Sequence, residues 1–110
     1  MELSYKTNKL QRSLTTDKGL AKTYGVLAKK LKLRINQLES AETLEVISRL
    51  PVLRLHRLLG KERRLWSIDV QENWRILFEL DHDPLPYMED GGVDIGSVTK
   101  IRIAAVEDLH

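Results

Sequence analysis

The spacing of the apolar residues changes near Pro51, and this change constrains the fold more than any other feature of the sequence. Before Pro51, the apolar side chains of residues 20–38 recur at steps of three or four, which predicts a helix with one buried stripe. After Pro51, apolar and polar residues alternate, which predicts strands. The helical stripe consists of Leu20, Tyr24, Leu27, Leu31, Ile35 and Leu38.

Two further helical segments flank this long helix. Residues 8–14 predict a short helical turn, and residues 41–49 predict a second helix. This second helix ends near Pro51, because the residue before a proline disfavours helical geometry. Gly25 lies inside the long helix and weakens it by about 1 kcal/mol relative to alanine.

Four segments predict strands. Residues 2–6 form a short N-terminal strand, residues 66–70 and 74–80 form a hairpin, and residues 98–106 form the last strand. The order is therefore a strand, then the helices, then three strands. We expect an α+β fold in which an N-terminal strand and two to three helices pack on one face of a small antiparallel sheet.

The length and composition fit a single domain over residues 1–110. Of these 110 residues 42% are hydrophobic, which is enough for a core. The chain has no cysteine, so disulfides and thiolate metal sites are excluded, as suits a reducing cytosol. No apolar run approaches the roughly 20 residues of a membrane span, and the N-terminus has no apolar signal core. We expect an unsecreted, cytoplasmic protein without a membrane partner.

Charge is distributed unevenly along the chain, although the net charge is only +2. Fifteen of the 18 Lys and Arg residues precede residue 65, and ten of the 16 acidic residues follow residue 64. This asymmetry favours one basic face that attracts a polyanion. A basic helix surface that is simply solvated is the alternative, and charge alone does not decide between the two.

Four residues are candidates for acid–base chemistry on a phosphodiester. His56 precedes the hairpin, and Arg75 lies on the polar side of a strand; Asp108 and His110 end the chain. Histidine exchanges protons near neutrality, arginine stabilises the charge of a phosphorane, and aspartate orients an imidazole. The alternatives are a structural histidine, an arginine paired with a neighbour such as Glu79, and a frayed terminus.

Residues 81–97 are rich in proline, glycine and acidic residues, which predicts a loop. Asp81, His82 and Asp83 offer ligands for a cation, but crowded loop acids are usually solvated. The sequence has no glycine-rich phosphate loop, nucleophile elbow or His-Glu-x-x-His zinc helix. We expect no metal and no cofactor.

Three short segments carry a family signature. Residues 55–60 read Leu-His-Arg-Leu-Leu-Gly, residues 65–78 contain Trp-Ser-Ile and Asn-Trp-Arg-Ile, and the chain ends in Glu-Asp-Leu-His. These segments resemble HigB-type toxins of the RelE/ParE superfamily, where the first reads Leu-His-Pro-Leu-Lys-Gly and the end is near Glu-Asp-Tyr-His. The resemblance covers the whole chain, is specific in these segments and is loose over the helices.

The resemblance implies an antiparallel sheet with two N-terminal helices and a ribosome-dependent endonuclease that cuts mRNA. The nucleophile would be the ribose 2′-hydroxyl, so DNA would be spared. By position, His56 and His110 would transfer protons, Arg75 would hold the scissile phosphate, and Asp108 would support the site.

The resemblance also implies contacts outside the catalytic residues. Basic side chains would bind the backbone of ribosomal RNA, so activity would fall with salt. The implied partner is a helix-turn-helix antitoxin that covers the site, and operator DNA would be contacted only through this antitoxin. The RNA-binding candidates are Lys29, Lys30, Lys61, Arg63 and Arg64.

The chain departs from the family at several positions. Leu109 replaces a tyrosine, Arg57 replaces a proline, Leu59 replaces a lysine, and the acidic loop would repel phosphates. Two alternatives to the nuclease therefore stay open. One is a non-catalytic member that blocks gyrase, and the other is a retired toxin that only binds its antitoxin.

Overall fold

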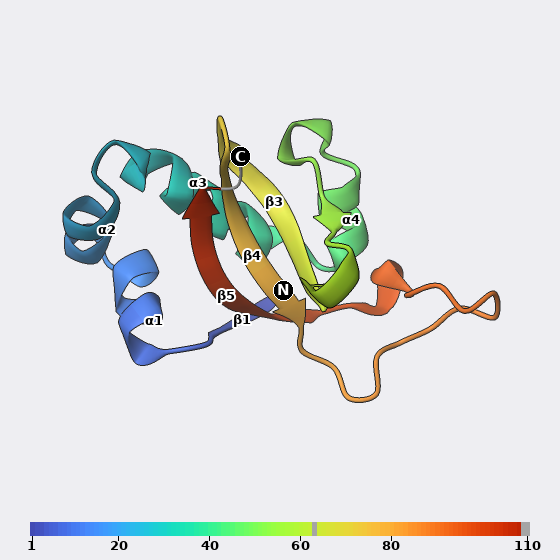
Figure 1. Ribbon diagram of the computed structural model, residues 1–110. Coiled ribbons are helices and arrows are strands. Elements are labelled where there is room, and N and C mark those ends of the chain that lie inside the picture. Colours follow the sequence, from blue (N-terminus) through green and yellow to red (C-terminus); the bar gives the residue numbers. More distant parts are fainter. Residues whose placement is uncertain (63, 109–110) are drawn as a thin grey trace.

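The computed structural model describes residues 1–62 and 64–108, and its elements follow the predicted order, except that a short strand at His56–Arg57 was not predicted (Figure 1). A strand comes first, four helices follow, and four strands complete the described chain. The helices and strands are β1 (Glu2–Tyr5), α1 (Asn8–Thr15), α2 (Asp17–Tyr24), α3 (Ala28–Ser40), α4 (Leu44–Ser48), β2 (His56–Arg57), β3 (Leu65–Gln71), β4 (Trp74–Leu80) and β5 (Lys100–Asp108).

The predicted α+β class is confirmed, but the sheet is mixed rather than antiparallel. Its five described strands lie in the order β1-β5-β4-β3-β2. Neighbours from β5 to β2 are antiparallel, whereas β1 runs parallel to β5, with Leu3 opposite Ile101. The last strand, β5, pairs with β4 on one side and with β1 on the other. It runs antiparallel to β4, and β1, which the chain reaches before the helices, runs in the same direction as β5.

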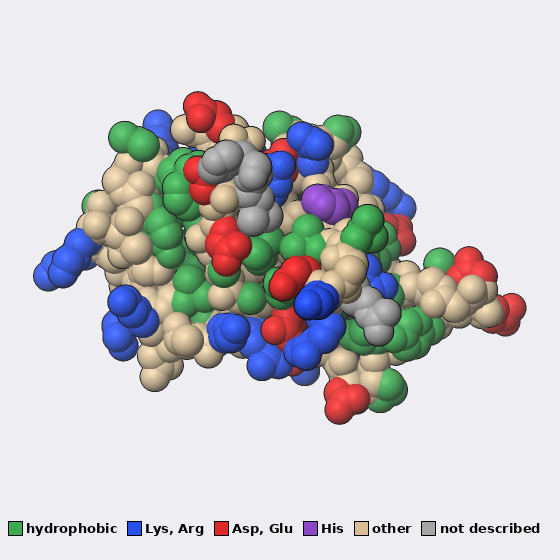
Figure 2. All heavy atoms as spheres, in the orientation of Figure 1, with side chains coloured by type: hydrophobic (Ala, Val, Ile, Leu, Met, Phe, Trp, Pro, Cys, Tyr) green, Lys and Arg blue, Asp and Glu red, His purple; other side chains and the backbone are tan. Residues whose placement is uncertain are grey.

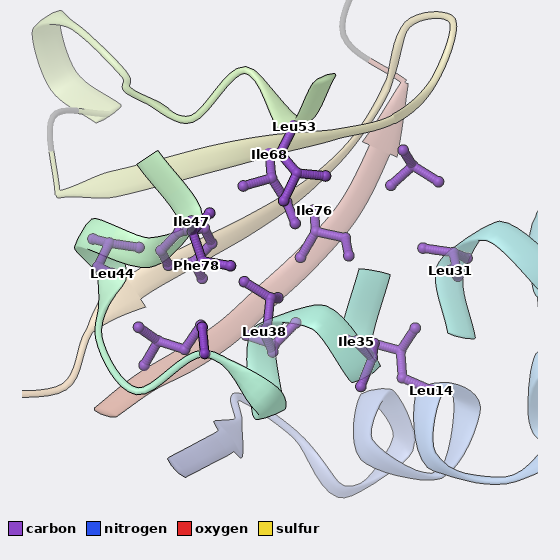
Figure 3. Close-up of a cluster of buried hydrophobic side chains, with 14 of the residues drawn as sticks. Leu14, Leu31, Ile35, Leu38, Leu44, Ile47, Leu53, Ile68, Ile76 and Phe78 are labelled. Atoms are coloured by element: carbon purple, nitrogen blue, oxygen red, sulfur yellow. The ribbon is translucent and has the colours of Figure 1, made fainter. Parts of the chain in front are cut away.

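The core lies between the sheet and the helices (Figure 3). Leu31, Ile35 and Leu38 of the predicted stripe are buried on α3, and α4 adds Leu44 and Ile47. These side chains pack with the apolar face of the hairpin, so one face of the sheet is covered. The sheet contributes Ile68, Val70, Ile76, Phe78, Ile101 and Ile103 to the same cluster.

The predicted long helix over residues 20–38 is wrong, because Gly25 divides it. Helix α2 ends at Tyr24, a 3-10 turn covers Gly25–Leu27, and α3 then begins at Ala28. Gly25 has φ 53° and ψ −117°, a backbone conformation that residues with a Cβ atom rarely adopt. The break separates α2 from α3, and the stripe residues Leu20 before it and Leu27 and Leu31 after it remain buried.

Two smaller boundaries also differ. The helix predicted over 41–49 covers only Leu44–Ser48, because the chain at Ala41 is extended. The last strand begins two residues later than predicted and reaches Asp108. The hairpin turn is tight, with Glu72 in a left-handed conformation at φ 53°. In the described part of the chain, no helix is both long enough and apolar enough to span a membrane.

Candidate functional site

Strand register places His56 and Arg75 on the same face of the sheet, opposite the helices. His56 is paired with Ser67, and two residues further along β3 Asp69 is paired with Arg75. The residue between them, Ile68, points into the core. Since side chains alternate along a strand, the two pairs form successive rows on the face turned away from the helices, which we call the open face.

Arg75 is held by Asp69 rather than by Glu79, the neighbour that the sequence suggested. The Arg75 Nη1 atom lies 2.8 Å from the Asp69 Oδ1 atom, and the two side chains are only 15% and 17% exposed. The reason is the register, which places Arg75 directly opposite Asp69. Glu79 instead pairs with Arg64, at 3.3 Å between Oε2 and Nη2.

Two further arginines meet Asp69. Arg54 approaches its other carboxylate oxygen at 3.7 Å. From the helix side, the buried Arg34 donates through Nε to the main-chain carbonyl of Asp69 at 2.9 Å. Burial lowers the pKa of Arg34, and the nearby charge of Asp69 acts in the opposite direction. Asp69 was not among the residues predicted from the sequence. The short hairpin, which places Asp69 opposite Arg75, could have indicated it.

The Asp69–Arg75 pair is expected to couple more strongly than an exposed pair. A double-mutant cycle with Asp69→Asn and Arg75→Gln should give roughly 1–2 kcal/mol of coupling in the free energy of unfolding, because the pair is largely removed from water. The same cycle on Arg64 and Glu79 should give about 0.5 kcal/mol or less, since the Arg64 side chain is 80% exposed. Urea unfolding of the variants measures both values, and equal coupling would contradict the assignment.

His56 presents an accessible imidazole at the edge of the sheet. It is exposed, and its Nδ1 atom lies 3.4 Å from the hydroxyl of the fully buried Ser67. This distance is long for a hydrogen bond, so the contact orients the ring only weakly. His56 is therefore available to a molecule bound on the open face.

A hollow of about 380 Å³ lies on the open face, with Lys61, Glu62 and Arg64 on one side and β5 on the other. Its charged lining is balanced, with three bases and three acids. Figure 2 likewise shows basic and acidic side chains interspersed over the middle of this side of the molecule. The bases are Lys6, Lys61 and Arg64, and the acids are Glu62, Glu79 and Glu107.

Comparison with known proteins now identifies the family. The model of a family described as "RelE-like toxin of type II toxin-antitoxin system HigB" matches residues 3–89. The chain belongs to this family. The matched segment holds His56, Arg75, Lys61 and Arg64, whereas β5 lies beyond it. No curated protein matches the toxin.

A solved structure shares the toxin's fold. A YoeB/ParE toxin from Agrobacterium tumefaciens superposes with a TM-score of 0.53 at 13% sequence identity, over 100% of both chains. At this identity the likeness supports the fold alone. Together with the family match, it makes the chain a type II toxin of the RelE/ParE type, and such a toxin has an antitoxin partner.

Among the described residues, Asp108, Lys29 and Lys30 do not share the open face with Arg75. Asp108 is paired with Trp74, whose ring packs against the core, so its row belongs to the helix-covered face; Glu107 is the residue opposite Arg75. Lys29 and Lys30 lie on α3, which packs against the covered face. Arg63 and His110 lie outside the described residues.

Two of the three residues considered as cation ligands, Asp81 and His82, make structural contacts at the start of the acidic loop. His82 accepts hydrogen bonds through Nε2 from the main-chain N–H groups of Thr99 and Lys100, at 3.0 and 3.3 Å. Asp81 pairs with Arg102 at 3.3 Å. These contacts tie the start of the loop to β5. Over residues 1–62 and 64–108, no three or more His, Asp or Glu side chains are arranged to hold a metal ion.

Proposed function

We propose that the toxin is a ribosome-dependent endonuclease that cuts mRNA on the open face, without a metal or other cofactor. The observation that carries this proposal is the position of His56 and Arg75 in successive rows of that face, beside the hollow lined by Lys61 and Arg64. An accessible imidazole can exchange protons with the ribose, and a fixed guanidinium can stabilise the charge that develops on the phosphate.

The proposed reaction is an attack of the ribose 2′-oxygen on the adjacent phosphorus. The 2′-O–P bond forms, the P–O5′ bond breaks, the 2′-hydroxyl loses its proton and the 5′-oxygen gains one. His56 and His110 exchange these two protons, whereas Asp108, whose row lies on the helix-covered face, is given no part in the reaction. Arg75 stabilises the additional negative charge of the phosphorane. Its guanidinium has five N–H donors, so Arg75 can remain bonded to Asp69 while it binds the phosphate.

The charge balance of the hollow supports dependence on the ribosome. Three carboxylates offset the three bases, so naked RNA gains little electrostatic attraction there. The ribosome would supply binding energy and deliver mRNA to the open face. Ribosomal RNA contacts are assigned to Lys61, Arg63 and Arg64, with Lys29 and Lys30 reaching it from the helix side.

The test of this proposal is an in vitro cleavage assay with three substrates. We expect the purified toxin to cut mRNA on ribosomes, to leave the same mRNA intact in solution, and to spare mRNA with a 2′-deoxyribose at the cleaved position. The 5′ ends of the products are mapped by primer extension. Cutting at the 2′-deoxy position would overturn the mechanism, and equal cutting of free RNA would overturn the dependence on the ribosome.

A non-catalytic toxin is the second candidate, and the carboxylates around the hollow favour it. In this version the open face binds a protein target such as gyrase, or only the antitoxin. Growth arrest with intact transcripts and DNA damage would support the gyrase-binding version. Normal growth with a folded toxin that still binds its antitoxin would support a retired toxin. The helix-turn-helix class of the antitoxin, its repression of operator DNA and a cytoplasmic location belong to the main proposal.

A further inference from the structure

We propose that Arg34, a buried arginine of α3, is a positioning residue for Arg75. Arg34 holds the main chain of Asp69, and the Asp69 carboxylate holds the guanidinium of Arg75 on the open face. The inference rests on the proposed function for the part that Arg75 plays in cleavage. Its structural half, that Arg34 keeps the Asp69–Arg75 pair in order, can be measured without any cleavage.

The main-chain carbonyl of Asp69 lies beyond the end of the neighbouring strand. Carbonyl groups along a strand point alternately to its two sides, and the Leu65 carbonyl accepts from the Leu58 N–H at 2.9 Å, on the side of β2. Pairing is regular from Leu65 to Asp69, so the Asp69 carbonyl points to that same side. Within the described chain, β2 pairs with β3 only at Trp66 and Ser67 and therefore ends before it reaches this carbonyl.

Arg34 takes the place of the missing strand partner. Its Nε atom donates to the Asp69 carbonyl at 2.9 Å, and its Nη1 atom donates to the Oε1 atom of Gln37 at 2.9 Å, about one turn further along α3. The residue is only 5% exposed. A main-chain carbonyl inside a fold needs a donor, and a guanidinium held by two acceptors has little freedom to move. Arg34 therefore ties α3 to the main chain of β3 at Asp69.

Asp69 stands beside a break in the strand register. Pairing between β3 and β4 is regular as far as Asp69 and Arg75, and it then shifts by one residue, so that Gln71 lies opposite Trp74. A bulge of this kind bends the strand and changes the direction of nearby side chains. The bond from Arg34 acts at the last regular pair before the shift. It therefore restricts the main chain that carries the Asp69 carboxylate.

Two arginines compete for the Asp69 carboxylate. Its Oδ1 atom lies 2.8 Å from Arg75, and its Oδ2 atom lies 3.7 Å from Arg54, whose side chain is 71% exposed. Rotation of the carboxylate toward Arg54 would release Arg75 from its place in the row. Because the main chain sets the direction of the carboxylate, a fixed Asp69 carbonyl favours the pair with Arg75. Without the bond from Arg34, we expect Arg75 to lose order while the fold persists.

Nuclear magnetic resonance of the arginine side chains tests the structural half of the inference. The measured quantity is the rate at which the Arg75 guanidinium rotates about its Nε–Cζ bond, with its signal identified by comparison with Arg75→Gln. Rotation should be slow in the parent protein, because Asp69 holds the Nη1 atom. We expect Arg34→Met to speed the rotation at least about fivefold, which corresponds to the loss of roughly one hydrogen bond.

Two further variants separate positioning from a general effect on the fold. Leu31→Ala empties a fully buried position one turn earlier on α3, so it should lower the thermal midpoint at least as much as Arg34→Met. It should leave the rotation of Arg75 unchanged. Gln37→Leu keeps Arg34 but removes the acceptor of its Nη1 atom. This milder variant should speed the rotation by about twofold, and it serves as the test if Arg34→Met does not fold.

Cleavage kinetics on the ribosome test the functional half. We expect Arg34→Met to lower the rate at saturating ribosomes by at least about tenfold, because a displaced guanidinium meets the phosphorane poorly. The ribosome concentration at half saturation should stay within about twofold. The substitution should change the rate by no more than about twofold in an Arg75→Gln background, and by the full tenfold or so in a His56→Ala background, because Arg34 acts only through Arg75.

The outcomes that contradict the inference are distinct from those that contradict the nuclease. Unchanged rotation of Arg75 in Arg34→Met and in Gln37→Leu would overturn it. An equal loss of rate in Leu31→Ala, or the same loss in both backgrounds, would also overturn it, because Arg34 would then act through the fold alone. A parent toxin that cuts no mRNA would instead contradict the proposed function. The rotation measurement would then still decide whether Arg34 orders the Asp69–Arg75 pair.

Discussion

Replacing His56 with alanine is expected to lower the rate of mRNA cleavage on the ribosome by at least about 100-fold, which is the lower range for losing a general acid or base. The thermal midpoint of the toxin should change little. His56 is exposed, lies on the short edge strand β2, and makes one long contact at 3.4 Å to Ser67. The activity loss should therefore appear in the rate at saturating ribosomes, with the protein fully folded.

His82→Ala is the matched control for this prediction. It removes an imidazole that accepts main-chain hydrogen bonds from Thr99 and Lys100, at the base of the acidic loop. We expect it to lower stability by about 1 kcal/mol and to preserve cleavage at temperatures where the protein is folded. If His56→Ala cleaves at the parent rate, His56 is not the proton-transfer group. Equal losses of cleavage activity in the two variants would show that His56→Ala lowers activity by destabilising the fold.

Replacing Phe78 with alanine is expected to lower the free energy of unfolding by about 3–5 kcal/mol. Phe78 is completely buried on β4, between strands β3 and β5, and packs in the cluster that joins the sheet to α3 and α4. Alanine would leave a cavity in that cluster that the surrounding elements can fill only in part. For a domain of this size, such a loss corresponds to a drop of roughly 10–20 °C in the thermal midpoint.

Urea unfolding followed by far-ultraviolet circular dichroism measures the Phe78 effect. The midpoint should fall while the slope m stays constant, because the surface exposed on unfolding is nearly unchanged. Leu59→Ala is the control, since Leu59 is 87% exposed and should change stability by no more than about 0.5 kcal/mol. A loss below about 1.5 kcal/mol for Phe78→Ala would mean that the cluster closes around the missing ring.

The helical stripe and the alternating hairpin were predictable because each is a local pattern. Leu31, Ile35 and Leu38 face the core as their spacing indicates, and the pairing of β3 with β4 follows from a short polar turn. The family signature likewise pointed to the RelE/ParE fold. The helix break was not predicted, because a single glycine within a helical pattern is compatible with either a weakened helix or a turn.

The candidate site was predictable only in part. The sequence singled out His56 and Arg75, but their common face depends on the pairing of His56 with Ser67 in β2, a strand that was not predicted. It could not show that Asp69 stands opposite Arg75 and also meets Arg54 and the buried Arg34, because these contacts depend on register and on the packing of α3 against β3.

By itself, the sequence determined the α+β class, the order of the elements, the buried residues of α3 and the hairpin, and the family. These properties depend on residues close together in the chain. Only the tertiary structure decided that β5 enters between β4 and β1, which makes one pair of strands parallel and leaves the outer edge of residues 104–107 beside α1 and α2. Strand order depends on which distant segments bury the most apolar surface together, and no local pattern encodes that choice.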